Sequence, residues 1–171
     1  MLERRIDHAT RKRVAQMSPE EMKRALLTSE KTGLPNRRAY EEAGASAFAS
    51  MSDLDGLKGL NDKFGYAAGD TLICRFAELL VTAGLDAYHF QGDEFVCRGA
   101  TFEELDVKLH EVQQLLREQP FAVCGLDGRV TTIAGADFCF GIGTNLEEAE
   151  RSLKGQKELR ASSRLPWGFP R

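Results

Sequence analysis

The sequence of 171 residues lacks the features that mark several classes of protein. No segment approaches the run of about 20 apolar residues that spans a bilayer, and the charged N-terminal stretch MLERRIDHATRKR lacks the apolar core of a secretory signal. The net charge of −3 gives no basic excess of the kind that nucleic-acid-binding domains carry. We therefore expect a cytoplasmic protein with no membrane span and no nucleic-acid partner.

Cysteine is sparse and gives no sign of a zinc site. No two cysteines form a Cys-x-x-Cys pair, and no histidine lies at zinc-ligand spacing from them. Each lies in an apolar segment, where free cysteine behaves as a small hydrophobic residue. The sequence therefore predicts four buried thiols, at Cys74, Cys97, Cys124 and Cys139.

The remaining composition is that of an ordinary globular domain, with 42% hydrophobic and 29% charged residues. A chain of this length is expected to form one main domain. We place it at residues 28–162, after an N-terminal helical segment at 1–27 and before an extended tail at 163–171. The N-terminal helix is a candidate surface for dimerisation or for a protein partner.

The most informative stretch is AYHFQGDEFVCR, at residues 87–98, where side chains alternate between apolar and polar around one glycine. A period of two predicts strands, and Gly92 permits the tight turn of a β-hairpin. Asp93 and Glu94 then lie at the tip, where their charges repel each other unless a metal ion or a cationic group lies beside them. The alternative is an ordinary solvated turn.

A second acidic pair, Asp53 and Asp55, follows a short apolar strand. Residues two apart in a strand point to the same side, so Leu54 between them should enter the core, and its carbonyl oxygen can join the carboxylates as a hard ligand. Open α/β sheets bind ligands at the ends of their strands. The pattern is therefore consistent with a metal site.

Helices are expected on both sides of the hairpin. A first short helix after Asp55 carries Asn61 on its polar side, and a longer helix is expected to follow Gly69 and Asp70. The simplest interpretation of Asp70 is the N-cap of that helix. Three residues are predicted N-caps of other helices: Ser18, Asn36 and Thr101. A final helix, at residues 146–162, carries basic residues on one face, either solvated or functional: Lys154, Lys157 and Arg160.

Three motifs in this order resemble the GGDEF domain of diguanylate cyclases: TGLPNRR at 32–38, DLDGLKGLNDKFGYAAGD at 53–70 and QGDEF at 91–95. The resemblance covers about residues 28–160. It implies an α/β fold of the α+β type, with a central, mainly antiparallel sheet wrapped by helices, similar to the palm of nucleotide cyclases and polymerases. It also implies that two subunits, each holding one GTP, meet in a two-fold homodimer and form cyclic di-GMP with release of two pyrophosphates.

The resemblance assigns a metal site to Asp53, the carbonyl of Leu54 and Asp93, which should hold Mg²⁺, with Mn²⁺ as an alternative ion. Two such ions about 4 Å apart polarise the α-phosphate and activate the attacking 3′-hydroxyl. Glu94 is expected near the metals or the ribose hydroxyl, and Lys58 near the phosphates. Asp93, Glu94 and Lys58 are thus the catalytic candidates.

Substrate-binding residues follow from the same resemblance. Asn61 and Asp70 match the family's guanine readers, because a carboxylate accepts hydrogen bonds from guanine N1–H and the exocyclic amine, whereas adenine has no donor at N1. Gly92 in the signature turn is expected to contact GTP. Lys157 and Arg160 in the last helix are expected to bind its phosphates.

The sequence departs from the family pattern at several positions. Gln91 stands where the family prefers glycine or another small residue, and Arg160 lies one position, about 100° around the helix, before the family's arginine, where this chain has Ala161. An Arg-x-x-Asp site for product inhibition would fall at 82–85, which reads Thr-Ala-Gly-Leu, so we expect no feedback inhibition there. One alternative is a catalytically inactive GGDEF-like module that binds GTP or a protein partner. Another is a palm-like nucleotidyl cyclase that uses other nucleotides.

Overall fold

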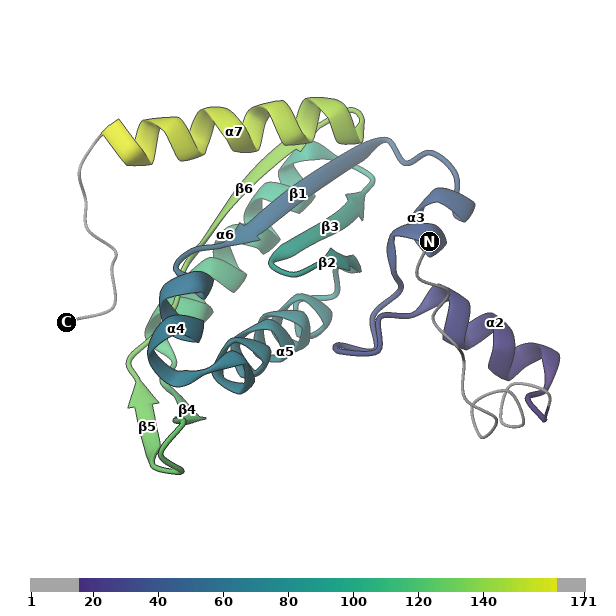
Figure 1. The fold of residues 1–171 in the computed structure, drawn as a ribbon. Coiled ribbons are helices and arrows are strands. Elements are labelled where there is room, and N and C mark those ends of the chain that lie inside the picture. The colour runs from purple at the N-terminus through teal and green to yellow at the C-terminus, as the bar shows by residue number, and fades with distance from the viewer. Residues whose placement is uncertain (1–15, 163–171) are drawn as a thin grey trace, which may run out of the picture.

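A four-stranded antiparallel sheet lies at the centre of the computed structural model, which describes residues 16–162 (Figure 1). Its spatial order is β2-β3-β1-β6, and its strands are β1 (Phe48–Leu54), β2 (Asp86–Gln91), β3 (Glu94–Gly99) and β6 (Phe138–Gly143). A separate antiparallel pair consists of β4 (Phe121–Cys124) and β5 (Val130–Ile133). The expected central antiparallel sheet is confirmed.

Helices cover both faces of this sheet (Figure 1). The helices of residues 16–162 are α2 (Pro19–Leu27), α3 (Arg37–Glu42), α4 (Leu57–Phe64), α5 (Tyr66–Thr82), α6 (Phe102–Glu118) and α7 (Leu146–Ser162), and α2 packs on α3 beside the sheet. The helices α4, α5 and α6 pack against one face, while α7 and α3 lie against the other. The expected helix-wrapped α+β fold is therefore confirmed as well.

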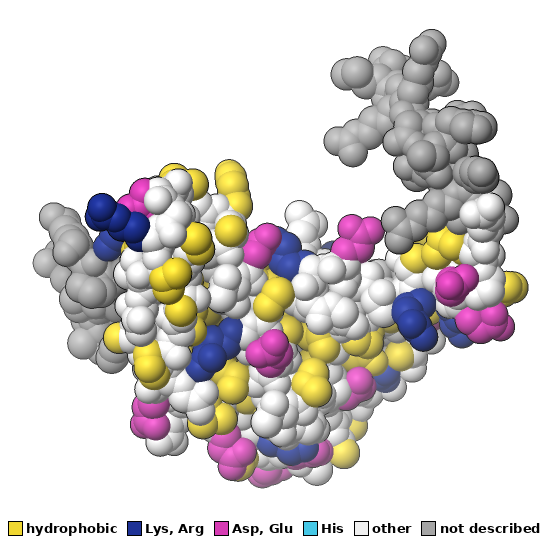
Figure 2. Space-filling view, turned by 90° about the horizontal axis from the view of Figure 1, so that it is seen from below, with side chains coloured by type: hydrophobic (Ala, Val, Ile, Leu, Met, Phe, Trp, Pro, Cys, Tyr) yellow, Lys and Arg dark blue, Asp and Glu magenta, His cyan; other side chains and the backbone are white. Residues whose placement is uncertain are grey.

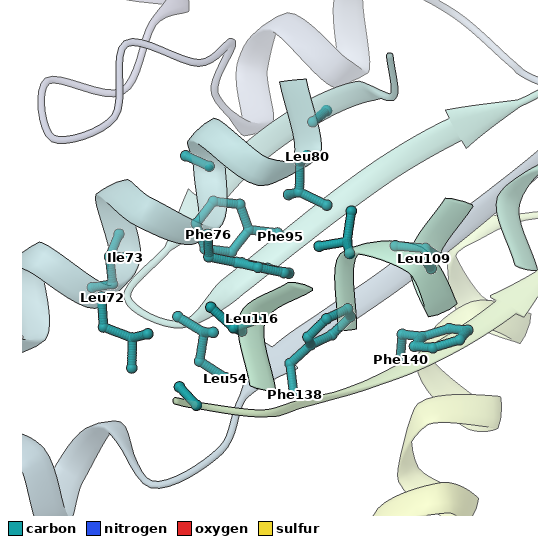
Figure 3. Close-up of a cluster of buried hydrophobic side chains, with 14 of the residues drawn as sticks. Leu54, Leu72, Ile73, Phe76, Leu80, Phe95, Leu109, Leu116, Phe138 and Phe140 are labelled. Atoms are coloured by element: carbon teal, nitrogen blue, oxygen red, sulfur yellow. The ribbon is translucent and has the colours of Figure 1, made fainter. Parts of the chain in front are cut away.

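The main core lies between the sheet and the α5–α6 layer (Figure 3). At its centre Phe76 of α5 contacts Phe95 of β3 and Phe138 of β6, with ring centroids 4.8 and 4.5 Å apart, and all three side chains are fully buried. Leu54 packs in the same cluster, as its position between two acids predicts. Buried aromatic rings of this size make a large apolar contribution to folding.

The helix α7 lies directly on β6 because two glycines of that strand leave room for it. A Cβ atom at Gly141 would overlap the backbone at Ala149 and Leu153, and one at Gly143 would overlap residues Glu148 and Ala149. The Gly-x-Gly at the end of this strand is therefore a packing feature. The close contact fixes the height of α7 above the sheet end.

Local capping signals are confirmed where the structure describes them. Ser18 and Glu21 form a reciprocal capping box at α2, and the side chains of Asn36 and Thr101 accept hydrogen bonds from the first turns of α3 and α6. The predicted N-cap role of Asp70 is wrong, because α5 begins four residues earlier, at Tyr66. The chain turns into α5 at Gly65, which has a φ of 90°.

The cysteine prediction is correct for only half of the thiols. Cys97 and Cys139 are buried, but Cys74 is half-buried and Cys124 is exposed. Residues along β4 alternate between buried and exposed, and Cys124 falls on the exposed side of this two-stranded ribbon. A prediction of burial from hydrophobicity alone therefore fails for a residue in this two-stranded ribbon.

Among residues 16–162, no helix combines the length and the apolar composition needed to cross a bilayer. On the face seen from below in Figure 2, acidic and basic side chains are interspersed with hydrophobic ones. Residues 1–15 of the expected N-terminal helical segment and the tail at 163–171 lie outside the described residues, so these expectations remain predictions.

Candidate functional site

The two acidic motifs meet at one end of the central sheet. The strand β2 ends at Gln91 and β3 begins at Glu94, so Gly92 and Asp93 form the two-residue turn of the expected hairpin, with Gly92 at a φ of 57°. Asp53 of β1 is the cross-strand partner of Glu94. The backbone N–H of Leu54 donates to the carbonyl oxygen of Asp93 at 3.3 Å, which ties the end of β1 to the turn.

A lysine from α7 compensates part of this negative charge. Lys157 Nζ lies 2.6 Å from Asp53 Oδ2. Burial raises the pKa of Asp53, the hydrogen bond from Lys157 opposes that shift, and the negative charge of Asp93 raises the pKa again. Like charges on opposed strands are unfavourable, and the ammonium group of Lys157 reduces this repulsion.

Asp55 takes part in a second charged cluster beneath α7. Arg160 Nη1 lies 2.6 Å from Asp55 Oδ2 and 3.2 Å from Asp137 Oδ2, and Arg117 Nη2 donates to the same Asp137 oxygen at 2.7 Å. Asp137 is buried, and its carbonyl accepts a 2.9 Å hydrogen bond from the N–H of Asp55. Burial raises the pKa of Asp55, and Arg160 opposes this. The cluster holds the C-terminal half of α7 against the strand end.

Asn61 and Asp70 come together through the packing of α4 on α5. Gly69 touches the Asn61 side chain so closely that a Cβ atom at position 69 would overlap it. Asn61 Oδ1 is buried and has no hydrogen-bond partner. Asp70, on the next residue of α5, is half-buried and paired with Lys31. The packing thus places Asn61 beside the residue that precedes Asp70, and their joint role in binding a base stays a prediction.

His89 connects the hairpin to the segment that carries the TGLPNRR motif. Burial lowers the pKa of this imidazole, so Nε2–H donates to the carbonyl of Gly92 at 3.1 Å and Nδ1 accepts from Ser29 Oγ at 2.8 Å. The ring stacks on Phe95, and its own backbone N–H donates to the Pro35 carbonyl at 2.9 Å. The three sequence motifs therefore meet in space.

Two site residues are not among the sequence predictions, His89 and Asp137. His89 is a polar residue inside β2, and Asp137 is a buried polar residue immediately before β6, each beside apolar neighbours, and that is the one signal that could have found them. Their functions in the fold depend on partners far away in the chain. The partner of His89 is 60 positions distant, and that of Asp137 is 20 positions distant.

Comparisons with known proteins show similarity to diguanylate cyclases and to GGDEF domain structures. No family model matches the chain. It is 36% identical over 74 residues to the diguanylate cyclase VdcA of Vibrio cholerae, a match that covers 37% of this chain and 22% of VdcA. The coiled coil and GGDEF domain of DgcB from Caulobacter crescentus, in complex with c-di-GMP, superposes with a TM-score of 0.65 and 20% identity, covering 88% of this chain and 90% of that chain.

A second solved structure gives the same result. The diguanylate cyclase SiaD from Pseudomonas aeruginosa, in complex with its activator SiaC, has a TM-score of 0.66 and 21% identity, with 88% of this chain and 66% of that chain covered. The chain has the fold of a GGDEF domain. The match spans less than a quarter of the length of VdcA.

Gln91 is exposed at the end of β2, and Lys58 is exposed in the first turn of α4. Within the described residues, no group of three or more His, Cys, Asp or Glu side chains could hold a metal ion. The metal-ligand roles expected for Asp53, Asp93 and the Leu54 carbonyl therefore stay predictions.

Proposed function

We propose that this protein is a diguanylate cyclase, which condenses two GTP molecules into cyclic di-GMP and releases two pyrophosphates. The observation that carries the proposal is the set of acids around Asp53 with the ammonium group of Lys157 against it. Positioning and charge neutralisation supply most of the catalysis in phosphoryl transfer, and this cluster offers both. The sequence similarity to VdcA, itself a diguanylate cyclase, supports the same reaction.

The acids suit Mg²⁺, with Mn²⁺ as an alternative ion. Burial raises the pKa of Asp53, and the nearby charge of Asp93 adds to that, so the two carboxylates repel each other and would gain from a shared cation. Asp53, Asp93 and the carbonyl of Leu54 would hold it, since hard oxygen donors are the ligands that Mg²⁺ prefers. When bound, the ion would polarise the α-phosphate and stabilise the leaving pyrophosphate.

The basic residues bind the triphosphate. When GTP binds, Lys157 leaves Asp53 and contacts the phosphates, because a polyphosphate carries more negative charge than one half-buried carboxylate. Lys58, exposed in the first turn of α4, reaches the same phosphates. Glu94, opposite Asp53 on the neighbouring strand, orients the 3′-hydroxyl that attacks the α-phosphate of the second GTP.

Guanine is selected by Asn61 and Asp70. The carboxylate of Asp70 accepts hydrogen bonds from N1–H and the exocyclic amine of the base. Among residues 16–162, the Oδ1 atom of Asn61 has no hydrogen-bond partner. Each subunit binds one GTP, so a two-fold homodimer brings the two nucleotides face to face.

A specific observation favours a second candidate, a catalytically inactive module that binds GTP or a protein partner. Arg160 contacts Asp55 and Asp137, so its guanidinium is already engaged by carboxylates. Gln91 adds a long side chain beside the signature turn. Both features reduce the groups available to the transferring phosphates while leaving the guanine site complete.

Mass spectrometry of the reaction products separates the two functions. The purified protein is incubated with GTP and Mg²⁺, at protein concentrations high enough for dimers to form, and the products are searched for cyclic di-GMP. The proposal expects cyclic di-GMP from the wild-type protein and none from Asp93→Asn, whose folding is checked by circular dichroism. GTP binding without any product would establish the inactive module instead.

A further inference from the structure

We propose that Lys31 is a guanine-specificity residue, whose ammonium group donates to O6 of the base that Asp70 binds. The inference rests on the proposed role of Asp70 as a guanine reader, and it does not depend on turnover. Lys31 lies in the segment before the TGLPNRR motif, 39 positions away from Asp70 in the sequence. Their ion pair therefore arises from the fold and not from helical spacing.

The backbone of Lys31 is held in place by its neighbours. The segment around it closes on itself, with hydrogen bonds of 2.8 Å from Ser29 N–H to the Leu34 carbonyl and from Gly33 N–H to the Ser29 carbonyl. The thiol of Cys74 on α5 donates to the carbonyl of Lys31 at 3.3 Å. Because Cys74 lies one helical turn after Asp70, this contact anchors Lys31 over the same face of α5.

The resulting pair matches the edge of guanine. Guanine presents, in order, an acceptor at O6 and donors at N1 and the exocyclic amine, whereas adenine presents a donor at its amino group and an acceptor at N1. A lysine beside a carboxylate offers a donor followed by acceptors, which is the complement of guanine only. The ammonium group of Lys31 can bridge O6 and the Asp70 carboxylate, so the ion pair need not break on binding.

A simple counter-ion role for Lys31 makes the opposite prediction. The side chains of Lys31 and Asp70 are 39% and 48% exposed, and pairs this exposed contribute little to stability. If Lys31 only neutralised Asp70, its removal would free the carboxylate and leave nucleotide binding unchanged or tighter. If it binds O6, its removal weakens the binding of guanine nucleotides selectively.

Calorimetric titrations with diphosphates test this, since GDP and ADP lack the pyrophosphate leaving group. We expect Lys31→Met to weaken GDP binding about tenfold, as for the loss of one charged hydrogen bond, and to leave ADP binding unchanged. Lys31→Arg should retain most of the affinity. The control is Lys23→Met, because Lys23 is exposed on α2 and should have no effect.

The nucleotide 6-thio-GDP isolates the contact at O6, because sulfur is a weak acceptor. Exchanging oxygen for sulfur should weaken binding several-fold in the wild type and hardly at all in Lys31→Met. GDP binding by Lys31→Met that is as tight as in the wild type would overturn the inference alone. Equal affinity of the wild-type protein for GDP and ADP would overturn the guanine role of Asp70 and the inference with it.

Discussion

Lys157 Nζ lies 2.6 Å from Asp53 Oδ2, so a residue proposed to bind substrate phosphates is in contact with a residue proposed to bind metal. The lysine side chain is 42% exposed and can swing away from the sheet, whereas the aspartate side chain is only 20% exposed and is held by its strand. Lys157 neutralises Asp53 until a more highly charged ligand binds the ammonium group of the lysine.

This contact predicts the effect of Lys157→Met. Loss of the ammonium group should raise the KM for GTP about tenfold, because a charge-assisted contact to the phosphates is removed. It should also raise the pKa of Asp53 further, since the hydrogen bond that opposes the burial shift is lost. Steady-state kinetics and NMR titration would measure the two effects. Lys154→Met, exposed on the same helix, is the matched control and should change neither.

The raised pKa of Asp53 predicts how stability depends on pH. An acid whose pKa is higher in the folded state than in the unfolded state destabilises the fold when it is ionised, and this penalty disappears as pH falls through the folded-state pKa. Asp53→Asn should therefore unfold at higher urea concentration than the wild type at pH 7, with the difference shrinking toward pH 4. Asp62→Asn, exposed on α4, should be within about 0.5 kcal/mol of wild type at both pH values. A difference that grows on acidification would contradict the sign of the shift.

The helices, strands and acidic residues of the site are largely predictable from local sequence patterns, while the tertiary contacts that hold them in place are not. Alternation around Gly92 predicts the hairpin, and two-residue spacing places Leu54 in the core. The start of α5 is not predictable, because Gly69 is typical of a helix end and yet lies inside the helix. Its missing side chain makes room for Asn61, a tertiary contact that no local pattern encodes.

The same limit applies to Arg160. Helical geometry correctly predicts that it shares a face with Lys157, which is why both point at the strand end. Its partners could not be predicted, because Asp137 comes from the segment before β6 and Asp55 from the turn after β1. Whether Arg160 also contacts phosphate stays a prediction.

Removing Arg160 should loosen α7. Arg160→Met leaves Asp55 and buried Asp137 with less compensating charge, which should cost about 1–2 kcal/mol of the free energy of unfolding. The cost is below that of a fully buried pair, because the Arg160 side chain is 33% exposed. Arg151→Met breaks only an exposed pair with Glu147 on the same helix and should cost no more than about 0.5 kcal/mol. Equal midpoints in urea for the two variants would show that the cluster does not stabilise α7.

Two glycines in adjacent helices offer a matched test of the guanine site. Gly69→Ala would push the new methyl group into Asn61, so we expect lower stability and weaker binding of guanine nucleotides. Gly59→Ala meets open space on exposed α4, so it should stabilise the protein by about 0.5–1 kcal/mol and leave binding unchanged. Thermal unfolding and GDP titration would measure both. Unchanged GDP affinity in Gly69→Ala would remove Asn61 from the binding site.

Replacing Gln91 shows whether catalysis is limited by the size of this side chain or by the restricted backbone conformation of a residue other than glycine. The Gln91 side chain is exposed, so shortening it should cost little stability. If the side chain crowds the α-phosphate, Gln91→Gly and Gln91→Ala should both raise kcat, by about tenfold or more, with unchanged GDP affinity. If the signature turn needs the backbone freedom of glycine, only Gln91→Gly should do so, because alanine keeps the restricted backbone. Values of kcat equal to wild type in both variants would show that Gln91 does not restrain catalysis. The ion pairs of Arg160 would then be the one proposed feature that favours an inactive module.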